Sequence, residues 1–230
     1  MEFLLFSYKI IIEAKDLVKT YQNGKGRLVV LDNINLQIRE HSIVSIVGES
    51  GVGKSTLLNV LSSLDVFDKG ELNIEGNNIK NFSEKQLCSI RNSSIGFIFQ
   101  FHHLLPDFNV RENILMPTWI NKDFEKNKKA DELLKDFGLK KISHKYPNEI
   151  SGGEKQRVAI LRSIINDPEV LFADEPSGNL DEKNSLKLID LFESINTNFG
   201  TSIVLTTHNP HIANMGGDKY ELKSKTLIKR

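Results

Sequence analysis

A glycine-rich segment has the composition and spacing needed to bind phosphate. Its residues are Gly48, Glu49, Ser50, Gly51, Val52, Gly53, Lys54 and Ser55, which fit the pattern GxxxxGK(S/T). The apolar run IVSIV precedes it and leucines at helical spacing follow it, as the motif requires. Glycines let successive backbone N–H groups form an anion nest, and the start of the following helix adds positive charge. We expect Lys54 to reach the β- and γ-phosphates of a nucleotide, Ser55 to bind Mg²⁺ and Thr56 to contact the α-phosphate; a plain glycine-rich turn is the alternative.

Two apolar runs farther along the chain end in polar residues. The run VLFA is followed by Asp174 and Glu175, and the run IVL is followed by Thr206, Thr207 and His208. Asp174 could hold Mg²⁺ through water, and Glu175 could orient or deprotonate an attacking water. His208 could hydrogen-bond the γ-phosphate. An acidic turn and a structural histidine are the alternatives.

Three other positions carry weaker signals. Ser151, Gly152 and Gly153 precede a segment with helical periodicity, so they form either an anion site or only an N-capped helix start. One chain does not need two such sites for one nucleotide, so a second chain could use this one. Gln100 stands at the end of the run IGFIF, and Tyr21 could stack on a base; alone, both are more often structural.

The strands and helices that must position these residues are predicted to form an α/β core. Buried parallel strands are predicted at Ile43–Val47, Ile95–Phe99, Val170–Ala173 and Ile203–Leu205, because continuous apolar runs are typical of a sheet covered on both faces. Asn33–Ile38 alternates and predicts an antiparallel strand with one wet face, and Leu72–Ile74 and Tyr220–Leu222 are predicted as similar edge strands.

Helical spacing and a change of composition complete the organisation. Leu57, Val60, Leu61 and Leu64 predict one helical stripe, and Val158, Leu161 and Ile165 predict a second. Between them, residues 107–148 are rich in charged side chains and predict a mostly helical insert, with a solvated helix that ends at Gly138.

The composition excludes several classes of protein. The 230 residues include 30 basic and 30 acidic side chains, and zero net charge argues against nucleic acid as the main partner. A single cysteine, Cys88, excludes an intramolecular disulfide framework. No run approaches the ~18 uncharged apolar residues that span a bilayer. The N-terminal run MEFLLFSYKIII contains Glu2 and Lys9, so we expect a short extension before a first strand rather than a signal peptide.

Taken together and in order, these motifs closely resemble those of the nucleotide-binding subunits of ABC transporters. In that family's terms they are Tyr21 (A-loop), the segment 48–55 (Walker A), Gln100 (Q-loop), ISGGE (signature), VLFADE (Walker B), Gly178–Asp181 (D-loop) and His208 (H-loop). The resemblance implies a P-loop NTPase (RecA-like) core with an antiparallel β-subdomain and an inserted α-helical subdomain. It implies one domain over residues 1–230, with the core at about 10–100 and 167–230 and the helical subdomain at about 101–166.

The resemblance also implies how the site works. Two chains would sandwich ATP and Mg²⁺ between Walker A of one subunit and Ser151, Gly152 and Gly153 of the other. Gln100 would contact Mg²⁺ and link the site to a membrane partner. Glu175 would be the general base, with His208 and Lys54 on the γ-phosphate.

The segment FQFHHLLPDFNVRENILMP begins at Phe99, one residue before Gln100. It is similar to that of the LolD/MacB/FtsE group and most like the LolD type. This implies an ATPase at the cytoplasmic face of the inner membrane that works with LolC/LolE-like permease subunits to release lipoproteins. A cell-division regulator of the FtsE type and a macrolide or peptide exporter of the MacB type remain open. His102 and His103 do not predict a metal site, because adjacent residues of an extended chain point to opposite faces.

Overall fold

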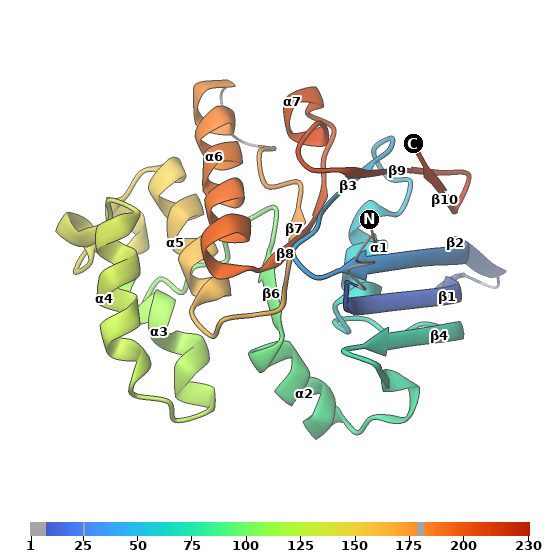
Figure 1. The fold of residues 1–230 in the computed structure, drawn as a ribbon, viewed down its shortest axis with the longest axis horizontal. Coiled ribbons are helices and arrows are strands. Elements are labelled where there is room, and N and C mark those ends of the chain that lie inside the picture. The colour runs from blue at the N-terminus through green and yellow to red at the C-terminus, as the bar shows by residue number, and fades with distance from the viewer. Residues whose placement is uncertain (1–7, 25, 179–181) are drawn as a thin grey trace, which may run out of the picture.

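The computed structural model describes residues 8–24, 26–178 and 182–230. Within these ranges the strands form a sheet of four, in the order β2-β1-β4-β5, and a sheet of six, in the order β10-β9-β3-β8-β7-β6 (Figure 1). Residues 179–181 of the predicted D-loop and residues 1–7 of the predicted extension lie outside the described residues.

The four apolar runs predicted as buried parallel strands are confirmed. They are β3 (Ile43–Val47), β6 (Ile95–Ile98), β7 (Val170–Asp174) and β8 (Ser202–Thr206). The parallel pairs β3–β8, β8–β7 and β7–β6 bring their carboxyl ends to one edge of the sheet. That edge is where polar loops of an α/β protein meet.

Both faces of this sheet are covered, which explains why its strands are apolar throughout. Leu171 and Ile203 pack into one core with α5 (Gly152–Ile164) and α6 (Glu182–Phe199). Phe172 and Val204 point to the opposite face and pack into a second core with α1 (Lys54–Leu61) and the antiparallel sheet. Alternate residues of one strand therefore serve different cores.

The antiparallel sheet contains β1 (Ile10–Asn23), β2 (Gly26–Arg39), β4 (Lys69–Ile74) and β5 (Asn77–Asn78). The prediction for Asn33–Ile38 is confirmed, because this part of β2 pairs antiparallel with β1 and buries only alternate residues. The sheet lies on the right of Figure 1, beside the six-stranded sheet.

The prediction that Leu72–Ile74 and Tyr220–Leu222 are edge strands is wrong. β4 lies between β1 and β5, and β9 (Asp218–Lys223) lies between β3 and β10 (Thr226–Lys229). Each strand is followed by a two-residue turn with positive φ at both residues, at 75–76 and at 224–225. Such turns fold a short strand back along the edge, and neither has the Asn-Gly sequence that would have signalled it.

The stripe predicted for the first helix is correct except at Leu64. Leu57, Val60 and Leu61 are buried, but α1 ends at Leu61 and the Leu64 side chain is 45% exposed. Ser63 has a φ of 59°, a left-handed conformation that stops the helix before Leu64.

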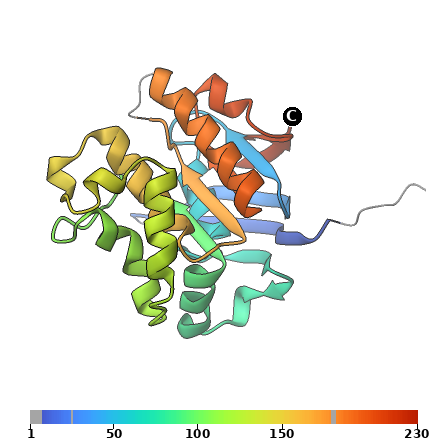
Figure 2. The same cartoon turned by 60° about the vertical axis from the view of Figure 1, so that its left-hand side comes forward.

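The charged middle of the chain forms a group of helices on one side of the six-stranded sheet (Figures 1 and 2). They are α3 (Val110–Ile120) and α4 (Lys126–Asp136), which pack with α5. The predicted end at Gly138 is confirmed, because this glycine has a φ of 69° just beyond α4. The structure also contains the helices α2 (Glu84–Ser93) and α7 (Pro210–Ala213).

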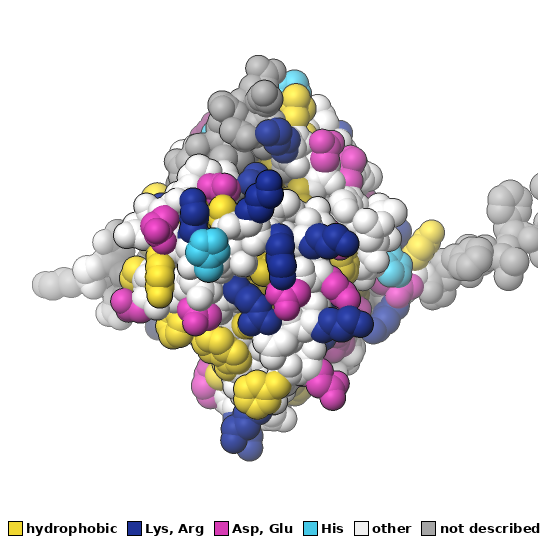
Figure 3. Space-filling view, turned by 90° about the vertical axis from the view of Figure 1, so that its left-hand side faces the viewer, with side chains coloured by type: hydrophobic (Ala, Val, Ile, Leu, Met, Phe, Trp, Pro, Cys, Tyr) yellow, Lys and Arg dark blue, Asp and Glu magenta, His cyan; other side chains and the backbone are white. Residues whose placement is uncertain are grey.

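The surface of this helical group carries charges of both signs. In Figure 3, which faces it, Lys and Arg side chains are interspersed with Asp and Glu. Among the helices of the described residues, none has the length and apolar character that a bilayer crossing requires.

Candidate active site

The phosphate loop begins where β3 ends and closes in the first turn of α1. Gly51 and Gly53 have φ angles of 77° and 112°, in the region that favours glycine. A Cβ on Gly53 would lie 2.8 Å from Cγ1 of Val30, and one on Gly48 would lie 2.6 Å from the carbonyl oxygen of Leu222. The loop can therefore curl and pack as it does only with glycine at these positions.

A hollow of about 550 Å³ lies over this loop. Its lining residues are Val30, Ser50, Gly51, Gly53, Lys54, Ser55, Thr56, Gln100, Glu175 and His208. The phosphate loop and the segments that follow β6, β7 and β8 meet here because their strands are parallel neighbours. Glu49 and Val52 belong to the loop without lining the hollow, and Val52 packs against the core beneath.

Lys54 is held inside this hollow by oxygen atoms. Its Nζ donates to the carbonyls of Gly48 at 2.9 Å and Glu49 at 3.1 Å, and it lies 3.3 Å from Oε1 of Glu175. The Lys54 side chain is only 8% exposed. A nearly buried ammonium among acceptors is well placed to exchange one of them for a phosphate oxygen.

Glu175 uses both of its carboxylate oxygens. While Oε1 faces Lys54, Oε2 accepts from the backbone N–H of His208 at 3.2 Å and lies 2.8 Å from its Nδ1. Because a carboxylate only accepts, this contact assigns a hydrogen to Nδ1 of His208. Glu175 also has a φ of 45°, a strained conformation, and its N–H donates to the Thr206 carbonyl at 3.1 Å.

Asp174, the last residue of β7, is oriented by its neighbour strand. The hydroxyl of Thr206 donates to Oδ1 of Asp174 at 2.8 Å. Thr206 is fully buried at the end of β8. Asp174 does not line the hollow itself but precedes Glu175, which does.

Gln100 is exposed at the mouth of the hollow and approaches the segment after β7. Its Nε2 lies 3.6 Å from the position that a Cβ on Gly178 would take. Gly178 is the only residue of the predicted D-loop in the described ranges.

Tyr21 lies outside the lining of the hollow, on β1. Its hydroxyl donates to Oδ2 of Asp65 at 2.6 Å, and Nζ of Lys19 lies 4.6 Å from its ring centroid. Burial, followed by the hydrogen bond to Asp65, raises the pKa of the Tyr21 phenol. Tyr21 remains 39% exposed and so is available for stacking.

Ser151, Gly152 and Gly153 are not among the residues that line the hollow. Ser151 caps α5, its hydroxyl and backbone N–H both donating to Glu154 Oε2, at 2.8 Å and 2.7 Å. These two bonds hold the pKa of Glu154 below its ordinary value. Among the described residues, a Cβ on Gly152 or Gly153 would meet no atom within 4 Å beyond its chain neighbours and its own helix, so packing against these residues does not require glycine there.

The segment after Gln100 borders a second hollow of about 350 Å³ between α2, α3 and α5. Arg91, Phe97, His103, Pro117 and Asn166 are among its lining residues. The neighbouring His102 is partly buried, and burial followed by the charge of Lys155 lowers its pKa.

Sequence reasoning missed two residues that position this site. In the sequence Thr206 is only part of a strand end, although a hydroxyl at the end of one apolar run and a carboxylate at the end of another are a usable signal. Arg162 donates to the carbonyls of His103 at 2.7 Å and His102 at 2.8 Å, and backbone carbonyls leave no trace in a sequence.

Comparison with known proteins places these features in one family. A family model described as ABC transporter matches residues 31–178. The curated "Lipoprotein-releasing system ATP-binding protein LolD" of Wigglesworthia glossinidia brevipalpis is 44% identical over 96% of this chain and 97% of that protein. The protein of the same name from Cytophaga hutchinsonii is 44% identical over 95% of this chain and 99% of that protein.

The fold matches solved structures equally well. A dimeric ATP-binding cassette in a post-hydrolysis state, bound to ADP and Pi, has a TM-score of 0.87 and 34% identity, covering 95% of this chain and 97% of that one. A dimeric bacterial ABC transporter cassette has a TM-score of 0.86 and 35% identity, covering 95% of this chain and 98% of that one.

Proposed function

The chain belongs to the ABC transporter family, and from that premise we propose that it is the ATP-hydrolysing subunit of a lipoprotein-releasing transporter. The observation that carries this proposal is the convergence of Lys54, Glu175 and His208 in the hollow above the phosphate loop. The relatives named for lipoprotein release match over nearly their whole length, which supports the choice of transport system.

The residues present fit ATP with Mg²⁺. The glycines at 51 and 53 shape the loop so that backbone N–H groups can bind phosphates beside Lys54, Ser50 and Thr56. Ser55, Gln100 and Asp174 offer hydroxyl, amide and carboxylate oxygens, the donors that Mg²⁺ prefers. When bound, Mg²⁺ would offset the negative charge that develops on the phosphates. We also propose that the chain divides into a RecA-like core at about 10–100 and 167–230 and a helical subdomain at about 101–166.

Glu175 is the proposed general base. Its carboxylate would take the proton of a water that attacks the γ-phosphorus, and His208 would hold the carboxylate and the γ-phosphate in position. Lys54 must then turn from Glu175 to the phosphates, which frees the carboxylate for the water.

A second copy of the chain is proposed to complete the site. Ser151, Gly152 and Gly153 lie outside the hollow of their own chain, and the glycines face open space. The start of α5 can therefore approach a nucleotide held by another subunit. The dimeric cassettes with the same fold support this arrangement.

A membrane permease is the other proposed partner. We place its contact at the hollow between α2, α3 and α5, which adjoins the segment after Gln100. The LolD-named relatives favour a LolC/LolE-like permease and a location at the cytoplasmic face of the inner membrane.

Reconstitution tests the proposal. The chain is co-purified with its permease, placed in liposomes that contain a lipoprotein, and supplied with ATP and a soluble lipoprotein carrier. We expect ATP-dependent transfer of the lipoprotein to the carrier, and none with Glu175→Gln. ATP turnover without transfer would favour the FtsE-like or MacB-like alternatives, and no turnover would refute the ATPase itself.

A further inference from the structure

Arg162, in the last turn of α5, binds two backbone carbonyls of one loop. Its two terminal nitrogens donate to the backbone carbonyls of His102 and His103. Burial lowers the pKa of this guanidinium, and within the described residues no carboxylate pairs with it. Its desolvation is therefore offset mainly by two carbonyls of one loop, since charge-assisted hydrogen bonds are the stronger kind.

The loop is shaped to present both carbonyls together. His103 has a φ of 44°, a left-handed conformation that is uncommon outside glycine and must be held by its surroundings. At its other end the loop is fixed to α3, where the side-chain amide of Asn113 bonds the N–H of Leu105 at 2.8 Å and its carbonyl at 3.1 Å. The loop after Gln100 thus has one anchor on α3 and another on α5.

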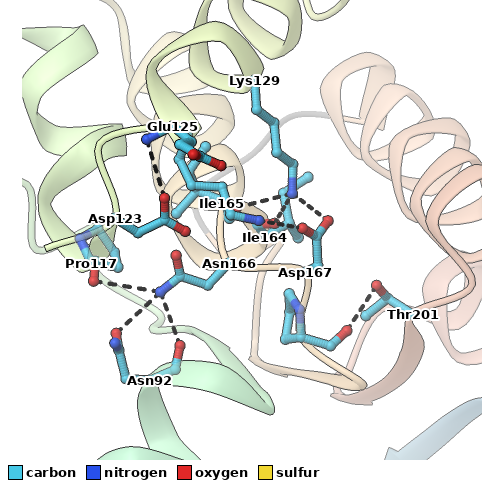
Figure 4. Close-up of polar contacts among 12 residues, drawn as sticks. Asn92, Pro117, Asp123, Glu125, Lys129, Ile164, Ile165, Asn166, Asp167 and Thr201 are labelled. Atoms are coloured by element: carbon cyan, nitrogen blue, oxygen red, sulfur yellow. Dashed lines mark hydrogen bonds and ion pairs between the residues drawn. The ribbon is translucent and has the colours of Figure 1, made fainter. Parts of the chain in front are cut away.

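The end of α5 that carries Arg162 is itself fixed to its neighbours (Figure 4). The side-chain amide of Asn166 donates to the carbonyls of Asn92 at 2.9 Å and Pro117 at 3.4 Å. Lys129 donates to the carbonyls of Ile164 and Ile165, at 3.2 Å and 2.9 Å. The end of α5 is thus held in place by hydrogen bonds, and from it the Arg162 side chain reaches the loop after Gln100.

We propose that Arg162 is a positioning residue that ties the loop after Gln100 to the helix that begins at Gly152, so that Gln100 and Ser151 change position together. Gln100 lies at the hollow and Ser151 caps the opposite end of the helix that Arg162 belongs to. A displacement of the loop at the permease side would then reach the residues offered to the second subunit. The effect on ATP hydrolysis rests on the proposed function. The link that Arg162 makes between the loop and α5 can be measured without ATP.

Hydrogen exchange of the purified chain tests the tie directly. Arg162→Gln removes the positive charge and the pair of guanidinium nitrogens that bind the two carbonyls, whereas Arg162→Lys keeps one charged donor. In Arg162→Gln we expect the loop amides that are hydrogen-bonded, those of Leu105 and Phe108, to exchange about tenfold faster or more, because the loop then opens more easily. The amides of α5 should keep their protection, and Arg162→Lys should fall between. Arg111→Gln is the matched control, because that arginine bonds Asp131 and Asn127 instead.

Kinetics then test the consequence. In Arg162→Gln we expect the dissociation constant of ATP to stay within about threefold of the unsubstituted chain, and kcat and permease stimulation to fall about tenfold, because orientation is lost while the phosphate loop is intact. Unchanged loop exchange, equal loss of protection in the loop and α5, or unfolding of both variants would each overturn the inference. A chain that never hydrolyses ATP would refute the proposed function. The hydrogen-exchange result would still decide whether Arg162 links the loop to α5.

Discussion

Lys54 and Glu175 form an ion pair inside the phosphate hollow, with Nζ 3.3 Å from Oε1 and both side chains at most 12% exposed. The proposed phosphate ligand and the proposed base are thus bound to each other. Each offsets the desolvation of the other, because an unpaired buried charge is costly. Phosphate binding and release of the base are therefore one exchange of partners at Lys54.

Glu175→Gln should stop turnover without loss of ATP binding. The amide keeps the shape of the side chain but cannot take a proton, so we expect kcat to fall by at least about 100-fold. Lys54 also loses its competing carboxylate, so ATP should bind at least as tightly and hold the chain as a dimer, seen by size-exclusion chromatography with ATP. Glu169→Gln, just before β7, is the control with full activity. Normal turnover in Glu175→Gln would remove that residue from the role of base.

Lys54→Ala should weaken ATP binding and also expose the cost of an unpaired carboxylate. Loss of a charged hydrogen-bond donor predicts a dissociation constant about 10- to 100-fold higher, measured by calorimetry. The same variant leaves Glu175 without its cation, so it should unfold more easily than the double variant Lys54→Ala/Glu175→Gln. Equal stability of the single and double variants would contradict the pairing.

Much of the site could be predicted because four of its motifs follow parallel strands of the six-stranded sheet. The runs that end before Gly48, Gln100, Asp174 and Thr206 form β3, β6, β7 and β8, and neighbouring parallel strands bring their ends together. The burial of these strands could be predicted in the same way. Their apolar residues do not alternate with polar ones, because a core covers each face of the sheet.

What the sequence did not reveal depends on side chains that meet across long separations. Lys54 with Glu175 and Arg162 with the carbonyl of His103 each require the completed fold. Leu64 was misplaced because periodicity does not register a left-handed Ser63. The false edge strands arose from turns whose residues, Ser224 among them, are not those usually found in tight hairpins.

Thr206→Val should weaken the metal site while preserving packing. Valine has nearly the shape of threonine, but Asp174 loses a hydrogen bond of 2.8 Å. We expect the Mg²⁺ concentration for half-maximal ATPase to rise about three- to tenfold, as loss of one hydrogen bond of about 1 kcal/mol predicts. Thr206→Ser, which restores the hydroxyl, should recover most of the affinity. An unchanged Mg²⁺ dependence in Thr206→Val would show that Thr206 does not position Asp174.

Asp167→Asn should lower stability at neutral pH but not in acid. Asp167 bonds the ammonium groups of Lys126 and Lys129 beside the end of α5. Burial tends to raise its pKa, but the hydrogen bonds from the two lysines outweigh this and hold the pKa below the ordinary 3.8. A carboxyl group whose pKa is lowered on folding stabilises the protein above its unfolded-state pKa, and this contribution is lost as pH falls through the folded-state value.

The free energy of unfolding in urea, compared between the unsubstituted chain and Asp167→Asn, measures this contribution. Because the Asp167 side chain is 55% exposed, we expect a difference of only about 1 kcal/mol or less at pH 7. The difference should be constant down to about pH 5 and shrink as pH falls below 3.8. Lys128→Met is the control on α4, the helix of Lys126 and Lys129, since within the described residues the one ion pair of Lys128 is a 3.8 Å contact with Glu132 and its side chain is 89% exposed. A difference that grows in acid would mean that the Asp167 pKa is raised rather than lowered, so the two lysines would not stabilise its charge.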